Sequence, residues 1–207
     1  NEKYQKNHWF LIIIKSLKKK FYIYIQFMFV QTLNTPNPNS LKFLPGEKVS
    51  LSGPVEFTEK KQTTNELVRN ILSINGVKGI FLSDDFISVN KNDEKDWEDI
   101  KHIIISFINE FYSDGNKHVY EASLDKNEEN NLDDIEKKII NLLETKIRPA
   151  VARDGGDIKF KEYKDGKVKV EMQGSCSGCP SSTMTLKRGV ENLLKHYIPE
   201  ITEVITV

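Results

Sequence analysis

The stretch D-G-G-D-I-K-F-K-E-Y-K-D-G-K-V-K-V-E-M-Q-G-S-C-S-G-C-P (residues 154–180) determines how the second half of the chain folds. Its K-D-G-K segment predicts a hairpin turn between two strands, Ile158–Tyr163 and Val168–Met172. The opening D-G-G-D (154–157) predicts another turn, because glycine adopts the positive φ angles that other residues resist. We expect D-G-G-D to shape the fold rather than to bind a ligand.

The elements on either side complete the order helix, strand, strand, helix, strand. Apolar residues recur at helical spacing over Leu132–Ile147, and Pro149 is expected to end this helix. A second helix is predicted over Pro180–Tyr197, and Thr202–Val207 alternates in the way that strands do. The second half is therefore predicted to be a small α+β domain.

The first half of the chain carries its own set of helices and strands. Helical spacing predicts helices over Thr63–Ile74 and Trp97–Tyr112. Between them, Val77–Leu82 and Phe86–Val89 are apolar runs joined by a hairpin signal. Further upstream, short apolar runs flank T-P-N-P-N (35–39), whose prolines favour extended or turn geometry. We expect this segment to be a structural turn in preference to a partner-binding site.

The predicted organisation is two small α+β domains joined by a flexible polar linker. The domains comprise residues 28–121 and 132–207, and residues 122–131 form the linker because the segment is mostly polar and without periodicity. Residues 1–27 form an extension that belongs to neither domain. Lysines interrupt its apolar run, so it is not a transmembrane helix. We interpret it as upstream sequence read in frame before Met28, with a targeting peptide as the alternative.

The composition limits the classes of partner. The chain has 207 residues with 30 basic and 30 acidic side chains, so its formal net charge is zero. Such a chain has no long-range field that would attract nucleic acid or an anionic membrane, and neither partner is expected. Two cysteines do not make a disulfide-rich secreted framework, which favours a reducing compartment.

The two cysteines, Cys176 and Cys179, lie between a predicted strand end and a predicted helix start. Pro180 suits the first helical turn, where unbonded N–H groups and the helix dipole favour thiolate over thiol. Gly174 and Gly178 let the backbone come close to a bound ion or cluster. The location predicts reactive, exposed sulfurs that can serve as metal ligands.

Three chemistries are open to this C-x-x-C pair. A thioredoxin-like oxidoreductase with Cys176 as nucleophile has a further β-β-α portion after its active helix, whereas one helix and one strand are predicted after Cys179. A structural zinc site needs four ligands, yet there is no second C-x-x-C and His196 lies roughly 25 Å along the helix. A four-iron cluster also needs four cysteines, which two copies of the chain in a two-fold dimer would supply.

Hypotheses from other classes stay open on the residues alone. One is a thiol–disulfide oxidoreductase that uses the same C-x-x-C, and another is an interaction module whose cysteines bind nothing. The sequence shows no Ser/His/Asp set, no phosphate-binding loop and no pair of carboxylates that stands out from surface charge. No catalytic residue is therefore predicted.

The chain resembles a known family, the Nfu-type iron–sulfur cluster carriers with a NifU-like C-terminal domain. In the second half, the resemblance lies in I-R-P-A-V-A-R-D-G-G-D-I (147–158), M-Q-G-S-C-S-G-C-P-S-S-T-M-T-L-K-R-G-V-E-N-L-L (172–194) and I-P-E-I-T-E-V (198–204). In the first half, it lies in T-P-N-P-N-S-L-K-F-L-P-G (35–46) and G-V-K-G-I-F-L-S-D-D-F-I-S-V (76–89). The extension before Met28 matches neither domain.

The resemblance implies an iron–sulfur cluster assembly and carrier protein that is not an enzyme. The two cluster-ligating cysteines of the family fall on Cys176 and Cys179, so a [4Fe–4S] cluster would be held between the two subunits of a homodimer. The cluster would come from upstream assembly proteins and pass to apo forms of iron–sulfur enzymes. The expected location is the cytoplasm of an alphaproteobacterium-like cell, with the mitochondrial matrix as the alternative.

Overall fold

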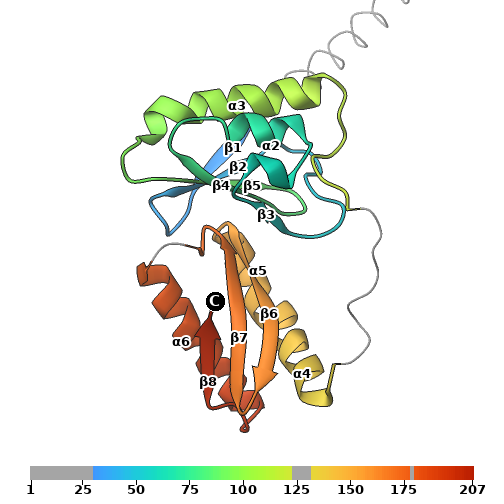
Figure 1. Ribbon diagram of the computed structural model, residues 1–207, viewed down its shortest axis with the longest axis vertical. Helices are drawn as coiled ribbons and strands as arrows, with labels where there is room; N and C mark the ends of the chain where they lie inside the picture. Colours follow the sequence, from blue (N-terminus) through green and yellow to red (C-terminus); the bar gives the residue numbers. More distant parts are fainter. Residues whose placement is uncertain (1–29, 123–131, 178–179) are drawn as a thin grey trace, which may run out of the picture.

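The computed structural model describes residues 30–122, 132–177 and 180–207, which fold into two units (Figure 1). The N-terminal unit comprises the described residues up to 122, and the C-terminal unit those from 132 onward. Each unit has its own sheet and its own hydrophobic core, which confirms the α+β fold class. The predicted extension and nearly all of the predicted linker lie outside the described residues.

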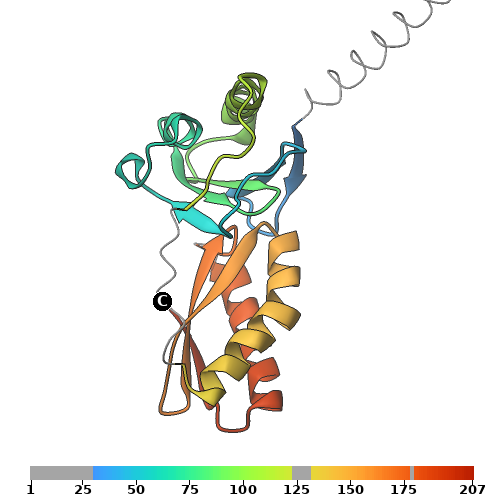
Figure 2. The same cartoon turned by 90° about the vertical axis from the view of Figure 1, so that its right-hand side faces the viewer.

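The N-terminal unit is built on a five-stranded antiparallel sheet in the order β1-β2-β5-β4-β3. Helices α2 and α3 cover one face of this sheet, and its other face is turned toward the C-terminal unit (Figures 1 and 2). Buried apolar side chains such as Phe43, Ile80 and Ile104 fill the layer between sheet and helices. The elements are β1 (Gln31–Asn34), β2 (Ser40–Leu44), β3 (Val55–Phe57), η1 (Lys60–Gln62), α2 (Glu66–Ile71), β4 (Val77–Leu82), β5 (Ile87–Lys91) and α3 (Trp97–Ser113).

The strands of this sheet divide their side chains between two different environments. Successive side chains of a strand point to opposite faces. In β5, Ile87 and Val89 enter the core, whereas Ser88 and Asn90 donate hydrogen bonds to the C-terminal unit. In β2, Lys42 also donates a hydrogen bond to the C-terminal unit. The sheet therefore presents mostly polar side chains to the C-terminal unit, with the buried ring of Phe81 among them.

The local patterns of the first half are largely confirmed. Helix α3 and the β4/β5 hairpin lie where they were predicted. Helix α2 is shorter than the predicted Thr63–Ile74, because the Asn65 side chain accepts a hydrogen bond from the Val68 backbone N–H at 3.1 Å and caps the helix later. Residues 72–74 form a turn beyond the helix end. Strand β3 was not predicted, since three residues are too few to show a periodicity.

The C-terminal unit contains a three-stranded sheet in the order β6-β7-β8, in which β6 and β7 are antiparallel and β7 and β8 are parallel. Its helices lie on one face of this sheet (Figure 2). Ile139, Val170 and Leu194 are among the buried side chains of the core between them. The elements are α4 (Asp134–Leu142), η2 (Leu143–Ile147), α5 (Arg148–Arg153), β6 (Gly156–Lys164), β7 (Lys167–Gly174), α6 (Pro180–Tyr197) and β8 (Glu203–Thr206).

The predicted hairpin of the second half is confirmed and is longer than expected. Asp165 and Gly166 both have positive φ, 50° and 75°, as the central residues of a tight hairpin turn require. At the other end of the hairpin, Gly156 pairs with Gly174, so D-G-G-D runs directly into β6. The hairpin therefore delivers the segment that follows β7 to the end of the sheet nearest the N-terminal unit (Figure 1).

The prediction that Pro149 ends the first helix of this half is wrong. A π-helical turn, η2, follows α4, and Pro149 is the second residue of α5. The π-helical turn shifts the backbone register, so that Pro149 falls in the first turn of a new α-helical segment. A missing N–H is tolerated there, whereas it would break a continuous helix.

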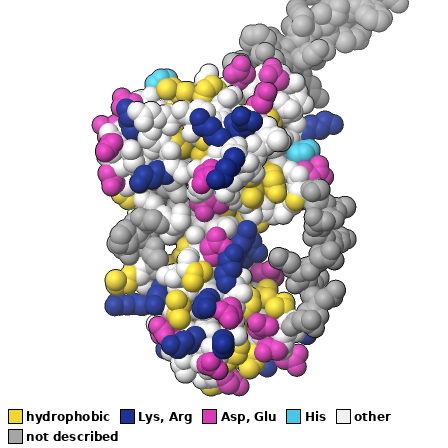
Figure 3. All heavy atoms as spheres, in the orientation of Figure 1, with side chains coloured by type: hydrophobic (Ala, Val, Ile, Leu, Met, Phe, Trp, Pro, Cys, Tyr) yellow, Lys and Arg dark blue, Asp and Glu magenta, His cyan; other side chains and the backbone are white. Residues whose placement is uncertain are grey.

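The surface carries charges of both signs. Figure 3 shows acidic and basic side chains interspersed over the face of both units that is in view, as expected for zero net charge. Among the residues that the structure describes, no helix is long and apolar enough to cross a membrane.

Candidate metal centre at the cysteine loop

The cysteine loop, residues 174–180, connects β7 to α6 and contains both predicted ligands. Its first half is a tight turn, because the Gly174 carbonyl accepts hydrogen bonds from Ser177 N at 3.1 Å and from Ser177 Oγ at 2.8 Å. Gly174 has a φ of 64°, which glycine tolerates at little cost. The next backbone N–H, that of Ser175, donates to Gly155 O at 3.1 Å. Backbone contacts within the C-terminal unit thus hold this half of the loop.

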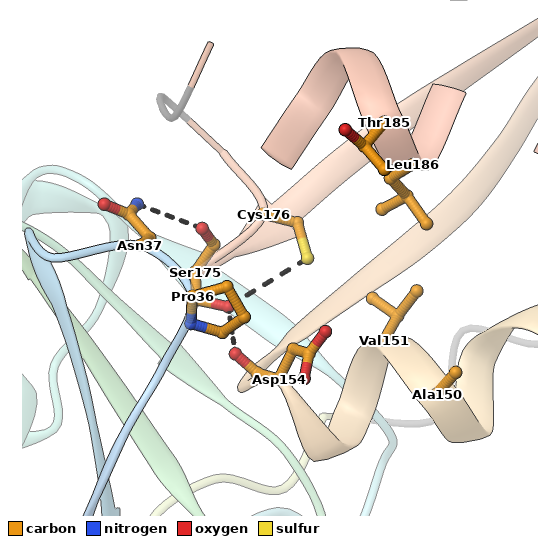
Figure 4. A pocket seen from close by; sticks show the side chains of 9 residues that line it. All are labelled: Pro36, Asn37, Ala150, Val151, Asp154, Ser175, Cys176, Thr185 and Leu186. Carbon is orange, nitrogen blue, oxygen red and sulfur yellow. Dashed lines mark hydrogen bonds between the residues drawn. The ribbon is translucent and has the colours of Figure 1, made fainter. Parts of the chain in front are cut away.

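Of the two predicted ligands, Cys176 is described by the structure, and Cys179 lies outside the described residues. Only 6% of the Cys176 surface is exposed, so the prediction of an exposed sulfur is wrong for this residue. Its sulfur points away from the loop toward Val151 of α5 and Leu186 of α6 (Figure 4). The prediction considered the loop alone, whereas the burial comes from the elements that pack around it.

A cavity of about 420 Å³ lies beside the Cys176 sulfur at the junction of the two units (Figure 4). Both units contribute to its wall, which combines apolar side chains with a few polar groups. The residues that line it are Pro36 and Asn37 of the N-terminal unit together with Ala150, Val151, Asp154, Ser175, Cys176, Thr185 and Leu186 of the C-terminal unit.

Two glycines of D-G-G-D bring the backbone close to the cysteine loop. A Cβ atom on Gly156 would lie 2.7 Å from the Cys176 sulfur and 2.6 Å from the Gln173 carbonyl oxygen, closer than such contacts occur. Gly155 has a φ of 84°, where a side chain is strained. The motif therefore shapes the fold, as predicted, and does so directly under the cysteine.

A buried ion pair fixes α5 against β6 near the same loop. Arg148 Nε and Nη2 donate to the two carboxylate oxygens of Asp157 at 2.7 Å and 2.8 Å, and Asp157 is only 3% exposed. The hydrogen bonds that Arg148 donates to this carboxylate raise the pKa of Arg148. A two-point contact of this kind sets orientation as well as distance. This contact was not predicted, since nothing local in the sequence pairs Asp157 with Arg148.

Two asparagines of the N-terminal unit bind the backbone of the cysteine loop. Asn37 Nδ2 donates to Ser175 O at 3.0 Å and to Ser177 O at 3.4 Å. Asn90 Nδ2 donates to Gly174 O at 2.9 Å and to Ser177 Oγ at 3.3 Å. Together they contact the residues on both sides of Cys176.

A carboxylate of the N-terminal unit reaches the same loop. Glu56 Oε1 accepts hydrogen bonds from Gly174 N at 3.1 Å and from Ser177 Oγ at 3.4 Å. Burial raises the pKa of Glu56 above its ordinary value, and the neighbouring Glu171 carboxylate raises it further. The hydrogen bonds and the nearby Lys159 ammonium oppose this shift without cancelling it.

These contacts between the units were not predicted from the sequence. T-P-N-P-N is the structural turn that was predicted, because Thr35 Oγ1 donates to Asn37 O and Ser40 O at 2.9 Å and 3.0 Å. The same turn also carries Asn37 to the cysteine loop. Asn90 and Glu56 were not considered at all. The available signal was the strand alternation, which places a polar side chain on the sheet face opposite to the core.

The other candidate ligands do not gather. Within the described ranges, no group of three or more His, Cys, Asp or Glu side chains is placed to hold a metal ion. His102 contacts Glu98 O on its own helix, and His118 pairs with Glu121. Both histidines therefore make local contacts within the N-terminal unit.

Comparison with known proteins identifies both units. The NifU-like domain model matches residues 139–205, and the model described as scaffold protein Nfu/NifU N terminal matches residues 30–115. The human protein named NFU1 iron-sulfur cluster scaffold homolog, mitochondrial, is 43% identical over 188 residues, which are 89% of this chain and 74% of the human protein. NifU-like protein 4, mitochondrial, of Arabidopsis thaliana is 43% identical over 181 residues, 84% of this chain and 64% of the plant protein.

The Drosophila erecta protein with the same name as the human one is 42% identical over 181 residues, 86% of this chain and 64% of the fly protein. The chain thus spans between 64% and 74% of the length of these relatives. A solved solution structure of a NifU-like protein from Saccharomyces cerevisiae overlaps 46% of this chain and 86% of its own, at 28% identity and a TM-score of 0.42. With both domain models matched in order and 42–43% identity to these relatives over most of its length, the chain belongs to the Nfu family of NifU-like proteins.

Proposed function

We propose that this protein is an iron–sulfur cluster carrier that holds a [4Fe–4S] cluster between two copies of the chain, with Cys176 and Cys179 of each copy as ligands. The observation that supports it most directly is the packing around the cysteine loop. Gly155 and Gly156 let the backbone lie close to Cys176, and the Arg148–Asp157 ion pair fixes α5 against β6 beside it. The names of its relatives, which describe cluster scaffolds, support the same role.

The ligand count requires the second copy. A four-iron cluster binds four cysteine thiolates, and each chain has two cysteines. A two-fold axis through the cluster supplies the other two thiolates, because it places identical loops face to face. The cluster is cargo in this scheme, and its shared position between subunits makes it easy to release.

Delivery is a ligand exchange and not a redox reaction. A thiolate of the acceptor protein forms a bond to one iron while the bond from that iron to Cys176 or Cys179 breaks. The departing cysteine leaves as a thiolate and takes up a proton according to its pKa. No electrons are transferred overall, so a carrier needs no catalytic residue of its own.

We further propose the division of labour between domains. Residues 28–121 form a domain that recognises assembly partners or acceptor proteins, residues 122–131 a linker, and residues 132–207 the cluster-binding domain. The two matched domain models, which end and begin within these bounds, support the division. Relatives named as mitochondrial support the second of the two expected locations, the mitochondrial matrix, and give no support to the first.

Anaerobic reconstitution with iron and sulfide tests the function. The carrier is expected to bind about two irons per chain and to change from monomer to dimer in size-exclusion chromatography with light scattering. Cys176→Ser and Cys179→Ser should each abolish both changes, whereas His196→Ala should retain them, because this histidine lies at the far end of α6. Iron binding that survives both cysteine variants would refute the assignment. Catalytic disulfide reduction in the absence of iron would instead favour the oxidoreductase.

A further inference from the structure

We propose that the N-terminal unit closes over the cysteine loop of its own chain, masks Cys176, and must release the loop before two chains can share a cluster. The arrangement described above is this closed state. The masking follows from the packing of Cys176 in the C-terminal core together with the contacts between the units that hold its loop there, and only the need for release rests on the proposed carrier function.

The closed state is held by side chains from the polar face of the N-terminal sheet and from the turn that precedes β2. Asn37, Glu56 and Asn90 bind the backbone and one hydroxyl of residues 174–177, on both sides of Cys176. These contacts join residues that are between 84 and 138 positions apart in the chain. The N-terminal unit therefore grips the part of the loop that carries the first cysteine.

Further contacts surround the loop. Ser88 Oγ donates to Gly155 O at 2.6 Å, and Lys42 Nζ donates to Ala152 O at 2.9 Å. In the opposite direction, Lys159 Nζ donates to Pro54 O at 3.1 Å. The contacts are thus directed mainly at backbone oxygens at the end of α5 and the start of β6, next to the loop.

The interface has the character of a contact that can open. Each unit has its own apolar core, and neither core includes a residue of the other unit. The polar groups that hold the units together would exchange their partners for water on opening, so the net loss per hydrogen bond is small. Opening would also expose the ring of Phe81, which is 1% exposed, belongs to neither core and lies against Gly174, so the open state is the minor one. Within the described residues, Asn90 Oδ1 and Gln173 Oε1 are buried without a hydrogen-bond partner, and opening would let water satisfy both.

The closed state is incompatible with a shared cluster. A second cysteine loop would have to approach Cys176 to within the width of one cluster. In the closed state, the Cys176 side chain is 6% exposed and packs into the core of the C-terminal unit, while Pro36 and Asn37 of the N-terminal unit line the cavity beside it. The N-terminal unit holds the backbone of the loop in this position, so that its release lets the loop carry Cys176 out of the core toward a second loop.

Alkylation of Cys176 measures the masking without any cluster. In the full chain with Cys179→Ser, Cys176 is the sole thiol, and its iodoacetamide rate relative to the urea-denatured chain reports the fraction of open molecules. Asn37→Ala and Asn90→Ala each remove a side chain that holds the loop, and each should raise the rate about three- to tenfold. The double variant should raise it by the product of the two factors, up to the denatured rate. Asn70→Ala, on the exposed surface of α2, is the matched control and should leave the rate unchanged.

Rates for Asn37→Ala and Asn90→Ala equal to that of Asn70→Ala would overturn the masking. A variant that fails to fold is recognised by the loss of its cooperative thermal transition. Hydrogen exchange in the unaltered chain then provides a second measurement. The Gly174 amide bonds to Glu56 across the interface and should be protected, whereas exchange of this amide as fast as in an unstructured peptide would also overturn the proposal.

Reconstitution separates this proposal from the carrier function. If the asparagine variants of the chain with both cysteines load iron and dimerise faster than the unaltered chain, and their Cys179→Ser counterparts alkylate faster, the closed state controls cluster sharing. Unchanged loading with faster alkylation would overturn the need for release and leave the carrier function intact. If no variant binds iron, the carrier function is wrong, and faster alkylation would still support the masking.

Discussion

Replacement of Gly156 by alanine provides a sharp test of how the cysteine loop is packed. The added methyl group would meet the Gln173 carbonyl oxygen at 2.6 Å and the Cys176 sulfur at 2.7 Å. The carbonyl belongs to the β6/β7 ladder and cannot shift without breaking strand pairing. Overpacking of a closed site lowers the free energy of unfolding by about 1–3 kcal/mol. Because the methyl group would meet backbone that cannot move aside, we expect a loss of about 2–3 kcal/mol for Gly156→Ala.

Gly189 supplies the matched control for this substitution. It lies on the exposed side of α6, and a Cβ atom there would meet nothing within 4 Å. Alanine is the better helix former, so Gly189→Ala should stabilise the protein by about 0.5–1 kcal/mol. The same chemical change is therefore expected to move stability in opposite directions at two positions of one unit.

Thermal unfolding followed by circular dichroism measures both effects. For a domain of this size, 1 kcal/mol corresponds to a shift of about 4–8 °C in Tm, so Gly156→Ala should melt at least about 8 °C lower. Both tryptophans lie outside the C-terminal unit, and with Trp9→Phe the fluorescence of Trp97 follows the N-terminal unit alone. For Gly156→Ala, the midpoint of the Trp97 fluorescence transition should shift less than the midpoint measured by circular dichroism. An unchanged Tm for Gly156→Ala would refute the packing described for the cysteine loop.

Two further predictions concern buried charges near the loop. Arg148→Gln leaves the Asp157 carboxylate buried without its ion pair and should lower the free energy of unfolding in urea by about 2–3 kcal/mol, whereas Arg188→Gln on the exposed surface should change it by less than about 0.5 kcal/mol. Equal stability of the two variants would contradict the role of the pair. Because the pKa of Glu56 is raised in the closed state, the closed state binds the proton more tightly, so its stability is highest below the ordinary value of 4.5 and is lost as pH rises through the raised pKa. The Gly174 amide resonance in NMR should titrate with a midpoint above 4.5 and lose this titration in Glu56→Gln, and a midpoint at or below 4.5 would contradict the burial of this carboxylate.

The local elements were the most predictable part of the fold. Helix α3 and the two hairpins lie where the sequence placed them, since hydrophobic periodicity and turn residues act over a few neighbouring positions. Strand β3 and the π-helical turn before Pro149 were missed. The strand is too short to carry a pattern, and the π-helical turn depends on how α4 and α5 pack against the sheet.

The candidate site was predictable in its residues but not in its surroundings. Cys176 and Cys179 stand out from the sequence as a C-x-x-C pair at a helix start, and the family resemblance added their expected role. The exposure of Cys176 was predicted wrongly, because a loop between strand and helix is exposed only if nothing packs on it. Whether something does so depends on residues remote in the chain.

The sequence by itself determined the α+β class, the hairpins, the glycines that the turns require, and a count of two cysteines, which is half of what the proposed four-iron cluster would need. The tertiary structure decided that Cys176 is buried and that Asn37, Glu56 and Asn90 reach its loop. The physical reason is one of range. Strand alternation sets the face on which a side chain lies, but the group that meets this face depends on how two separately folded units dock.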